Sequence, residues 1–130
     1  MHEGAGRYRH LPLGPQRRPC SSRKAKEILS SDEHELVFSL VSLWEIAIKI
    51  GTGKLRTVGS SVAYVRDEMD NYSMDLLPIR YDHILRLEML PYNKHSDPFD
   101  RLLIAQALTE GLPILTGDKA FREYGAKTIW

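Results

Sequence analysis

The chain has 130 residues, of which 42% are hydrophobic and 27% are charged, as is typical of one globular domain with a core of its own. Its single cysteine, Cys20, excludes an intramolecular disulfide and favours a reducing compartment. No apolar run approaches the roughly 18 residues that cross a bilayer, and no apolar segment follows the basic N-terminus as in a secretory signal. We therefore expect a cytoplasmic protein with no membrane segment.

The formal net charge of +1 hides an uneven distribution. Residues 1–30 contain seven Lys or Arg and two Glu, whereas residues 31–130 contain eleven Lys or Arg and fifteen Asp or Glu. This distribution does not favour a basic surface that wraps nucleic acid. The acidic side chains of the longer segment are equally suited to a metal site.

Residues 1–20 contain three prolines, three glycines and four arginines, with few large aliphatic side chains. Proline has no N–H to donate to a sheet, so we expect this segment to be irregular and to contain no central strand. The packed domain is expected to span residues 21–130.

From Ser21 onward, the pattern of apolar and polar residues predicts alternating helices and strands. In chain order, these are a helix in 21–31, a strand at 36–39, a helix at 42–53 with Ser42 as its N-cap, a helix at 60–73, a strand at 74–79, a helix at 80–90, a helix at 98–110 that ends at Gly111, a strand at 112–116, a short helix at 118–125 and a strand at 126–130. The alternation predicts an α/β domain with a mainly parallel sheet and helices on both faces.

Three acidic residues lie where parallel strands present functional groups, just beyond their carboxyl ends. Glu45 is a short turn beyond the strand at 36–39, Asp118 follows the strand at 112–116, and Asp100 is in the first turn of its helix. If the strands are parallel, all three acids can converge on one edge of the sheet.

Each acid also has a simpler structural interpretation. Asp97 and Asp100 form a good helix start, with negative charge favoured by the helix dipole. Asp118 can be the cap of the short helix that follows, and Glu45 can pair with Lys49 one turn further on.

The three acids together favour a bound cation. Carboxylates forced within about 4 Å of one another repel by roughly 4 kcal/mol per pair at an effective dielectric constant near 20. Hard oxygen ligands without paired His or Cys favour Mg²⁺ or Mn²⁺, and such a site can catalyse phosphodiester hydrolysis. His95 and Arg101 flank the acids and could hold a phosphate backbone, although a solvated surface position is the simpler interpretation of each.

Three stretches closely resemble the PIN-domain toxins of the VapC type: "SLVSLWEIAIKIGTGKL", "LPIRYDHILRLEMLPYNKHSDPFDRLLIAQAL" and "LPILTGDKAFREYGAKTIW". The resemblance covers about Ser21 to Trp130. It implies a PIN-like three-layer domain and a Mg²⁺-dependent (or Mn²⁺-dependent) endoribonuclease that hydrolyses RNA. It also implies the toxin half of a type II toxin–antitoxin pair, which forms a homodimer and is neutralised by an antitoxin protein.

The family's residues are carried over only where the motifs match. Glu45, Asp100 and Asp118 match the second, third and fourth acids, which are the catalytic metal ligands, and Asp97 matches an acid beside the third. Thr116, in the motif T-x-D, is expected to bind substrate together with His95 and Arg101. Trp44, next to Glu45, is expected to pack in the core, and the alternative is a place in the antitoxin groove.

The N-terminus departs from the family, which opens with an apolar strand ending in Asp, the first metal ligand. Residues 1–20 supply neither. With suitable codons, Glu3 to Pro19 can be read one nucleotide out of frame as an apolar strand, Asp-Thr-Asp and a Trp-containing helix, so we hypothesise a frameshift. We expect a sheet without its first central strand and a marginal fold. We also expect a metal site one carboxylate short, with weak Mg²⁺ affinity and little ribonuclease activity.

Two other functions remain open at this point. A catalytically impaired binding module of the same fold would engage an antitoxin or dimer partner without cleaving RNA. A DNA-directed nuclease of the same fold would show itself in a competition between DNA and RNA.

Overall fold

The computed structural model describes six parts of the chain: residues 7–10, 23–30, 35–54, 61–92, 97–116 and 119–130. The strands in these parts are β1 (Arg7–His10), β2 (Glu35–Ser39), β3 (Met74–Leu77), β4 (Ile114–Leu115) and β5 (Thr128–Ile129). The helices are α1 (Arg23–Ser30), α2 (Leu40–Gly51), α3 (Val62–Asn71), α4 (Tyr81–Glu88), α5 (Pro98–Glu110) and a 3₁₀ helix, η1 (Lys119–Tyr124).

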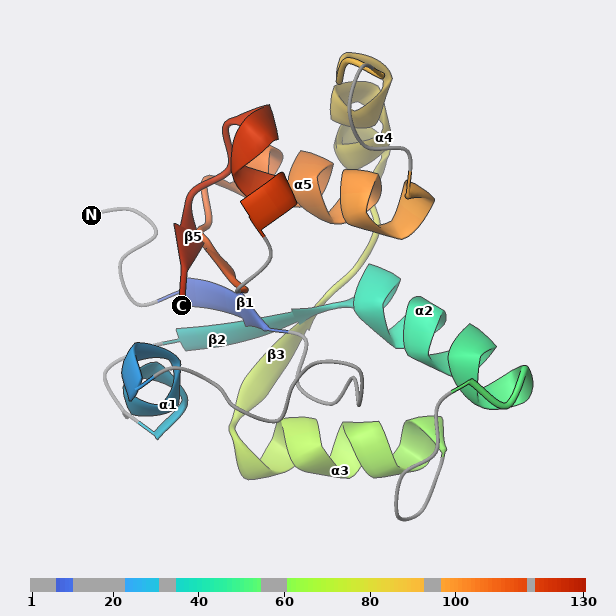
Figure 1. Ribbon diagram of the computed structural model, residues 1–130. Helices are drawn as coiled ribbons and strands as arrows, with labels where there is room; N and C mark the ends of the chain where they lie inside the picture. The colour runs from blue at the N-terminus through green and yellow to red at the C-terminus, as the bar shows by residue number, and fades with distance from the viewer. Residues whose placement is uncertain (1–6, 11–22, 31–34, 55–60, 93–96, 117–118) are drawn as a thin grey trace.

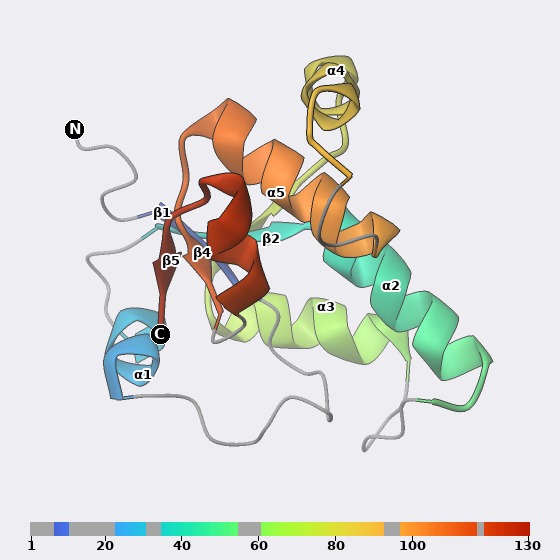
Figure 2. The ribbon, with the colours of Figure 1, turned by 45° about the horizontal axis from the view of Figure 1, so that its top comes forward.

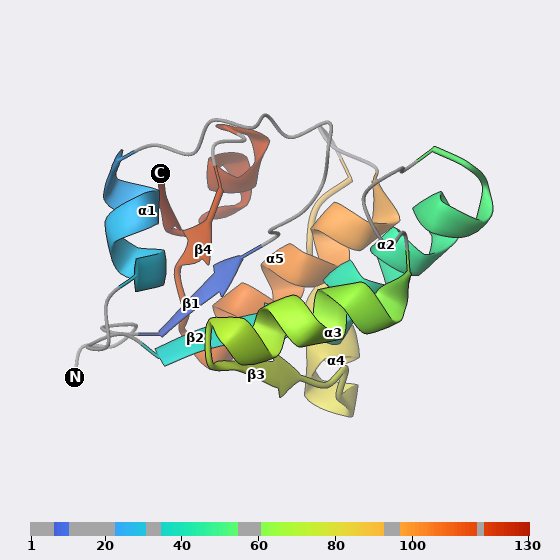
Figure 3. The ribbon, with the colours of Figure 1, turned by 90° about the horizontal axis from the view of Figure 1, so that it is seen from below.

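The strands form one sheet in the order β3-β2-β1-β4-β5, and every neighbouring pair is parallel. Helices α4, α5 and η1 lie on one side of the sheet, and α1 and α3 lie on the other (Figure 1). Figure 3, seen from below, shows α3 crossing in front of the strands. The predicted three-layer α/β architecture with a mainly parallel sheet is therefore confirmed.

The expectation that residues 1–20 contain no central strand is wrong. β1 lies in the middle of the sheet, where Arg9 pairs with both Val37 of β2 and Ile114 of β4. The argument from proline applied to the segment as a whole, yet its prolines stand at positions 12, 15 and 19. Four residues before them retain their N–H groups, which is enough for a short strand. The other residues of 1–20 lie outside the described parts.

The start of α2 also differs from the prediction. The N-cap is Ser39 rather than Ser42, because the Ser39 Oγ accepts a hydrogen bond from the Val41 N–H at 3.0 Å. Ser42 is fully buried inside the helix. The helix therefore begins directly at the carboxyl end of β2, and Glu45 lies nearly one turn deeper in it than the prediction placed it.

The core lies on both faces of the sheet, as expected for parallel strands. One cluster of buried side chains faces α1 and α3, and it includes Ile28, Phe38, Val65, Met69 and Met74. A second cluster faces α5 and η1, and it includes Val41, Leu103, Ile104, Ile114 and Phe121. None of the helices in the described parts of the chain is long and apolar enough to cross a membrane.

Helix α5 is the innermost helix, and its ends match the prediction. Asp97 caps its start, with Pro98 in the first turn, and Gly111 ends it in the left-handed conformation at φ 68°, which glycine adopts without steric cost. The seven consecutive residues 101–107 are all buried. Packing on every side therefore holds this helix, and with it Asp100, in a fixed position.

Candidate functional site

The parallel topology brings the segments that carry Glu45, Asp100 and Thr116 to one edge of the sheet. β2 and β4 lie on either side of β1, so their carboxyl ends face the same way. Helix α2 begins at the end of β2, and Thr116 follows the end of β4. Because α5 runs back to the start of β4, its own start lies at this same edge, near α2 (Figure 2).

An aromatic contact joins the two helices that carry acids. The rings of Trp44 in α2 and Phe99 in α5 meet edge to face, with their centroids 4.8 Å apart and their planes at 78°. Glu45 and Asp100 are the next residues along the two helices. The contact therefore places the backbones of the two acids close together, on neighbouring turns of α2 and α5.

Trp44 does not pack in the core, so that expectation is wrong. Trp44 is 51% exposed, and Ile48, one turn further along α2, is 42% exposed. The indole rests on Phe99 at the surface rather than entering the clusters on either face of the sheet. The apolar sequence around Trp44 predicted burial, but Ile46 is the residue of this turn that reaches the core.

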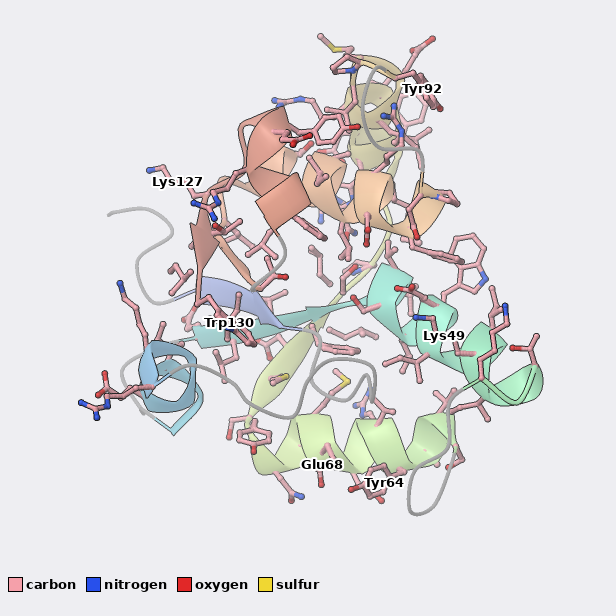
Figure 4. The ribbon with its side chains drawn as sticks, in the orientation of Figure 1. Lys49, Tyr64, Glu68, Tyr92, Lys127 and Trp130 are labelled. Carbon is pink, nitrogen blue, oxygen red and sulfur yellow. The ribbon has the colours of Figure 1, made fainter. Side chains whose placement is uncertain are left out.

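Glu45 is largely enclosed and carries a local charge partner. Its side chain is 17% exposed, and its Oε2 lies 3.3 Å from the Nζ of Lys49. Figure 4 labels Lys49 on α2. The pairing at i, i+4 agrees with the simpler interpretation of Glu45. It is also compatible with a metal site, since a flexible lysine can swing away when a divalent ion neutralises the carboxylate.

Asp97 and Asp100 have different surroundings in the first turn of α5. The Asp97 Oδ1 accepts hydrogen bonds from the N–H groups of Phe99 at 2.9 Å and Asp100 at 3.0 Å. This carboxylate therefore points towards its own helix as a cap. Asp100 is half-buried, on the turn whose Phe99 ring contacts α2.

The remaining site residues are only partly described. Thr116 is half-buried, and its N–H donates to the Ile129 carbonyl of β5 at 3.0 Å. His95 and Asp118 lie outside the described residues. Within the residues that are described, no group of three His, Cys, Asp or Glu side chains is arranged to hold a metal ion. The predicted trio includes Asp118, so this finding leaves that trio a prediction.

Arg101 has a structural role in place of the expected phosphate contact. Its side chain is 1% exposed, and its guanidinium donates to the carbonyls of Pro91 at 2.6 Å and Leu90 at 3.1 Å. The same group lies over the Tyr92 ring, 3.6 Å from its centroid. A guanidinium enclosed in this way holds the segment after α4 against α5, and its burial argues against contact with RNA.

A buried polar network beside the site was missed in the sequence. The Ser39 Oγ donates to the Gln106 Oε1, and the Gln106 Nε2 donates to the Pro78 carbonyl at 3.1 Å. The same Nε2 lies 3.2 Å from the Nδ1 of His83. Gln106 stands within the apolar run "LLIAQAL", and a lone amide in such a run is the signal that could have predicted a buried hydrogen-bond centre.

The network ends at the surface in an ion cluster. The His83 Nδ1 accepts the Arg80 N–H at 3.0 Å, so the ring proton sits on Nε2 and is donated to the Glu110 Oε2 at 2.8 Å. Arg80 also pairs with Glu110 through its side chain. Burial alone would raise the pKa of the Glu110 carboxyl, but the hydrogen bonds from His83 and Arg80 and the positive charge of Arg80 lower that pKa below its ordinary value.

The donor chemistry at this edge fits a hard divalent cation. The acids of α2 and α5 offer carboxylate oxygens, the donors that Mg²⁺ and Mn²⁺ prefer. No curated protein matches the chain. The family model described as "PIN domain" matches residues 18–127, a range that begins after β1. PIN domains are generally nucleases that use divalent metal ions, and PIN nucleases bind RNA. With this match over most of its length, the chain belongs to the PIN domain family.

Proposed function

We propose that this protein is a Mg²⁺-dependent endoribonuclease toxin of the VapC type, the toxin half of a type II toxin–antitoxin pair. Glu45, Asp100 and Asp118 hold the metal ion, with Mn²⁺ as the alternative to Mg²⁺. The observation that carries the proposal is the contact between Trp44 and Phe99, which joins α2 to α5 beside Glu45 and Asp100 and so supports a site shared by the two helices.

The residues of the site have separate tasks in this proposal. A bound divalent ion polarises the scissile phosphodiester and lowers the pKa of the attacking water. Glu45 supplies a carboxylate from α2, and Lys49 compensates its charge when no ion is bound. Asp97 keeps the first turn of α5 in place for Asp100. Thr116 and His95 hold the RNA.

Two exposed apolar surfaces support protein partners. The first, which we name the α4 surface, carries large exposed side chains: Tyr81 (78%), Ile84 (45%), Leu85 (45%), Met89 (75%) and Tyr92 (75%). We assign it to homodimer formation, because monomeric proteins rarely leave so many neighbouring apolar groups uncovered. We name the second, Trp44 with Ile48, the α2 surface. It adjoins Glu45, and we assign it to the antitoxin.

The experiment that tests the function is an RNA cleavage assay on the purified chain. Cleavage is expected in Mg²⁺, is expected to stop with EDTA and to return when Mg²⁺ is restored. Glu45→Gln and Asp100→Asn should each abolish it, because a neutral amide binds Mg²⁺ far more weakly than a carboxylate does. The control is Glu88→Gln, at an exposed position of α4. Cleavage that persists in EDTA, or that survives both substitutions, would contradict the proposal.

A second candidate function is a binding module of the same fold that engages an antitoxin or a second copy without cleaving RNA. One observation favours it: residues 1–20, which include the central strand, contain no Asp that could serve as the family's first acid. Association of the intact chain without any metal-dependent cleavage would select this function over the nuclease.

A further inference from the structure

The side-chain amide of Gln106 joins three elements of the fold. Gln106 is fully buried in α5. Its Oε1 accepts from the Ser39 Oγ at the end of β2, and its Nε2 donates to the carbonyl of Pro78, just after β3. The Nε2 also contacts the Nδ1 of His83 in α4. One amide therefore uses both its acceptor and its donors to hold α5 against its neighbours.

The bond from Ser39 matters most, because this residue sets where α2 begins. The Ser39 Oγ accepts the Val41 N–H as the N-cap while its hydroxyl proton goes to Gln106. A shift of Gln106 would therefore shift the first turn of α2. We name the Ser39–Gln106 hydrogen bond the clamp.

The number of residues between the clamp and the acid is the same in α2 and in α5. Glu45 follows Ser39 by six residues, and Asp100 precedes Gln106 by six residues. At 1.5 Å of rise per residue, each acid stands about 9 Å from the clamp along its own helix. Because the start of α5 and the length of α2 extend to the same side of the sheet (Figure 2), we expect this spacing to place the two acids side by side.

Two contacts, the clamp at one end and the Trp44–Phe99 ring contact at the other, thus fix α2 relative to α5. A single contact would leave the crossing angle free to change. Together with Val41 of α2, which packs in the same core cluster as α5, these two contacts set the angle and the axial register of α2 against α5.

The orientation of the amide is itself determined by its surroundings. The His83 Nδ1 has no proton, since it accepts the Arg80 N–H, and the Pro78 group is a carbonyl. Both can only accept, so the NH₂ of Gln106 faces them and the oxygen is left for Ser39. Glu110, one turn further along α5, holds the far side of the His83 ring.

We infer that Gln106 is a positioning residue for the metal site, setting the distance between the acids of α2 and α5 through Ser39. The inference rests on the proposed function and adds to it a residue that touches neither metal nor RNA. Partners bonded directly to metal ligands change metal affinity or activity by about 10- to 100-fold when they are removed; Gln106 acts one step further away, through Ser39, so we expect an effect at the lower end of this range.

The test replaces Gln106 with Met, which has a similar length and no hydrogen-bonding amide. The matched controls are Ile104→Val and Leu103→Ala, fully buried positions of the same helix that face the core. One control is expected to lower the melting temperature less than Gln106→Met does, and the other to lower it more. Every variant is assayed at a temperature where it is folded. Amide hydrogen exchange of residues 39–51, Mn²⁺ affinity by calorimetry, and kcat and KM on RNA are measured for each.

Gln106→Met is expected to exchange faster at the start of α2, to bind Mn²⁺ about tenfold more weakly and to lose kcat with little change in KM. Ser39→Ala should weaken Mn²⁺ binding as well, and the double variant should lose no more than the larger single loss, since both remove the same clamp. The two controls should match the wild type in exchange at α2 and in Mn²⁺ affinity.

If Gln106→Met shows the same hydrogen exchange or the same Mn²⁺ affinity as the controls, the inference is overturned and the nuclease proposal remains intact. A wild-type chain that binds no Mn²⁺ and cleaves no RNA would overturn the proposed function, and with it the positioning role. Hydrogen exchange at α2 would then still report whether the clamp exists, so the two failures are distinguishable.

Discussion

Replacement of Arg101 by Leu tests its assignment as a buried structural residue. The guanidinium donates to the carbonyls of Leu90 and Pro91 and lies over the Tyr92 ring, with 1% of the side chain exposed. Leucine keeps the packing of the aliphatic stem and removes every one of these contacts. The two carbonyls then lose their charged donor at a place that water scarcely reaches.

The size of the effect follows from these contacts. A hydrogen bond from a charged donor contributes about 1.5–3 kcal/mol, and a largely desolvated cation over an aromatic ring about 1–2 kcal/mol. Leucine avoids the cost of burying a charge, which offsets several kcal/mol of this sum. We therefore expect Arg101→Leu to lower the free energy of unfolding by about 3 kcal/mol, and the melting temperature by about 10 °C.

Urea and thermal unfolding of the purified variants measure the loss. Arg66→Leu is the control, because Arg66 is 61% exposed and forms a surface pair with Asp70, which contributes less than about 1 kcal/mol. A loss of the same small size for Arg101→Leu would refute the reasoning. A change in RNA binding would also refute the reasoning. If the slope of log affinity against log salt falls by about 0.7 in Arg101→Leu, the wild-type side chain contacts a phosphate of single-stranded RNA.

Three further predictions concern other parts of the structure. Because the pKa of Glu110 is lowered in the folded protein, its carboxylate stabilises the fold at pH values above its unfolded pKa of about 4.5, and this contribution is lost as the pH falls through the folded pKa. Glu110→Gln should therefore be less stable than the wild type near neutral pH and should lose less stability on acidification. Urea unfolding across pH measures both. Trp44→Ala should cost about 1 kcal/mol, the value of one edge-to-face contact with Phe99, rather than the roughly 3–5 kcal/mol of a core tryptophan. Met89→Glu on the α4 surface should shift the protein from dimer to monomer in sedimentation velocity.

Each of these predictions has its own control and its own contrary result. Glu88→Gln, exposed on α4, should leave the acid unfolding curve unchanged, and an equal change in both variants would remove the role given to Glu110. A loss above about 3 kcal/mol for Trp44→Ala would return that residue to the core. Lys54→Glu, on an exposed turn, should leave the sedimentation coefficient unchanged, and a monomeric wild type would contradict the dimer surface.

The sequence predicted the fold well wherever local chemistry decides the structure. The start and end of α5 follow from Asp97, Pro98 and Gly111, whose capping and left-handed preferences act within one turn. The alternation of helices and strands then determines a parallel sheet with two covered faces. These features need no knowledge of distant contacts.

Features that depend on distant contacts were predicted less well. β1 has an unpromising composition, and its place is determined by pairing with β2 and β4 on both edges. Trp44 and Arg101 show the same limit in opposite directions: an apolar residue stays at the surface and a charged one is buried. In each case the decision depends on partners far along the chain, such as Phe99 and Leu90, which local patterns do not reveal.

The sequence names the acids of the candidate site, whose role stays a prediction, while the geometry around two of them came from the structure. Glu45 and Asp100 were identified as acids at one edge of a parallel sheet. The ring contact between α2 and α5 and the buried clamp through Gln106 involve side chains that the sequence offered as core residues or left unremarked.

The central claim is that acids of three separate segments form one metal site. Its most direct test is a crystal soaked in Mn²⁺, from which anomalous diffraction data are collected. We expect one anomalous peak with carboxylate oxygens of Glu45, Asp100 and Asp118 at about 2 Å. The Asp97 carboxylate should remain beside this site as the helix cap. A peak bound elsewhere, or carboxyl groups of Glu45 and Asp118 on opposite sides of the domain, would contradict the account.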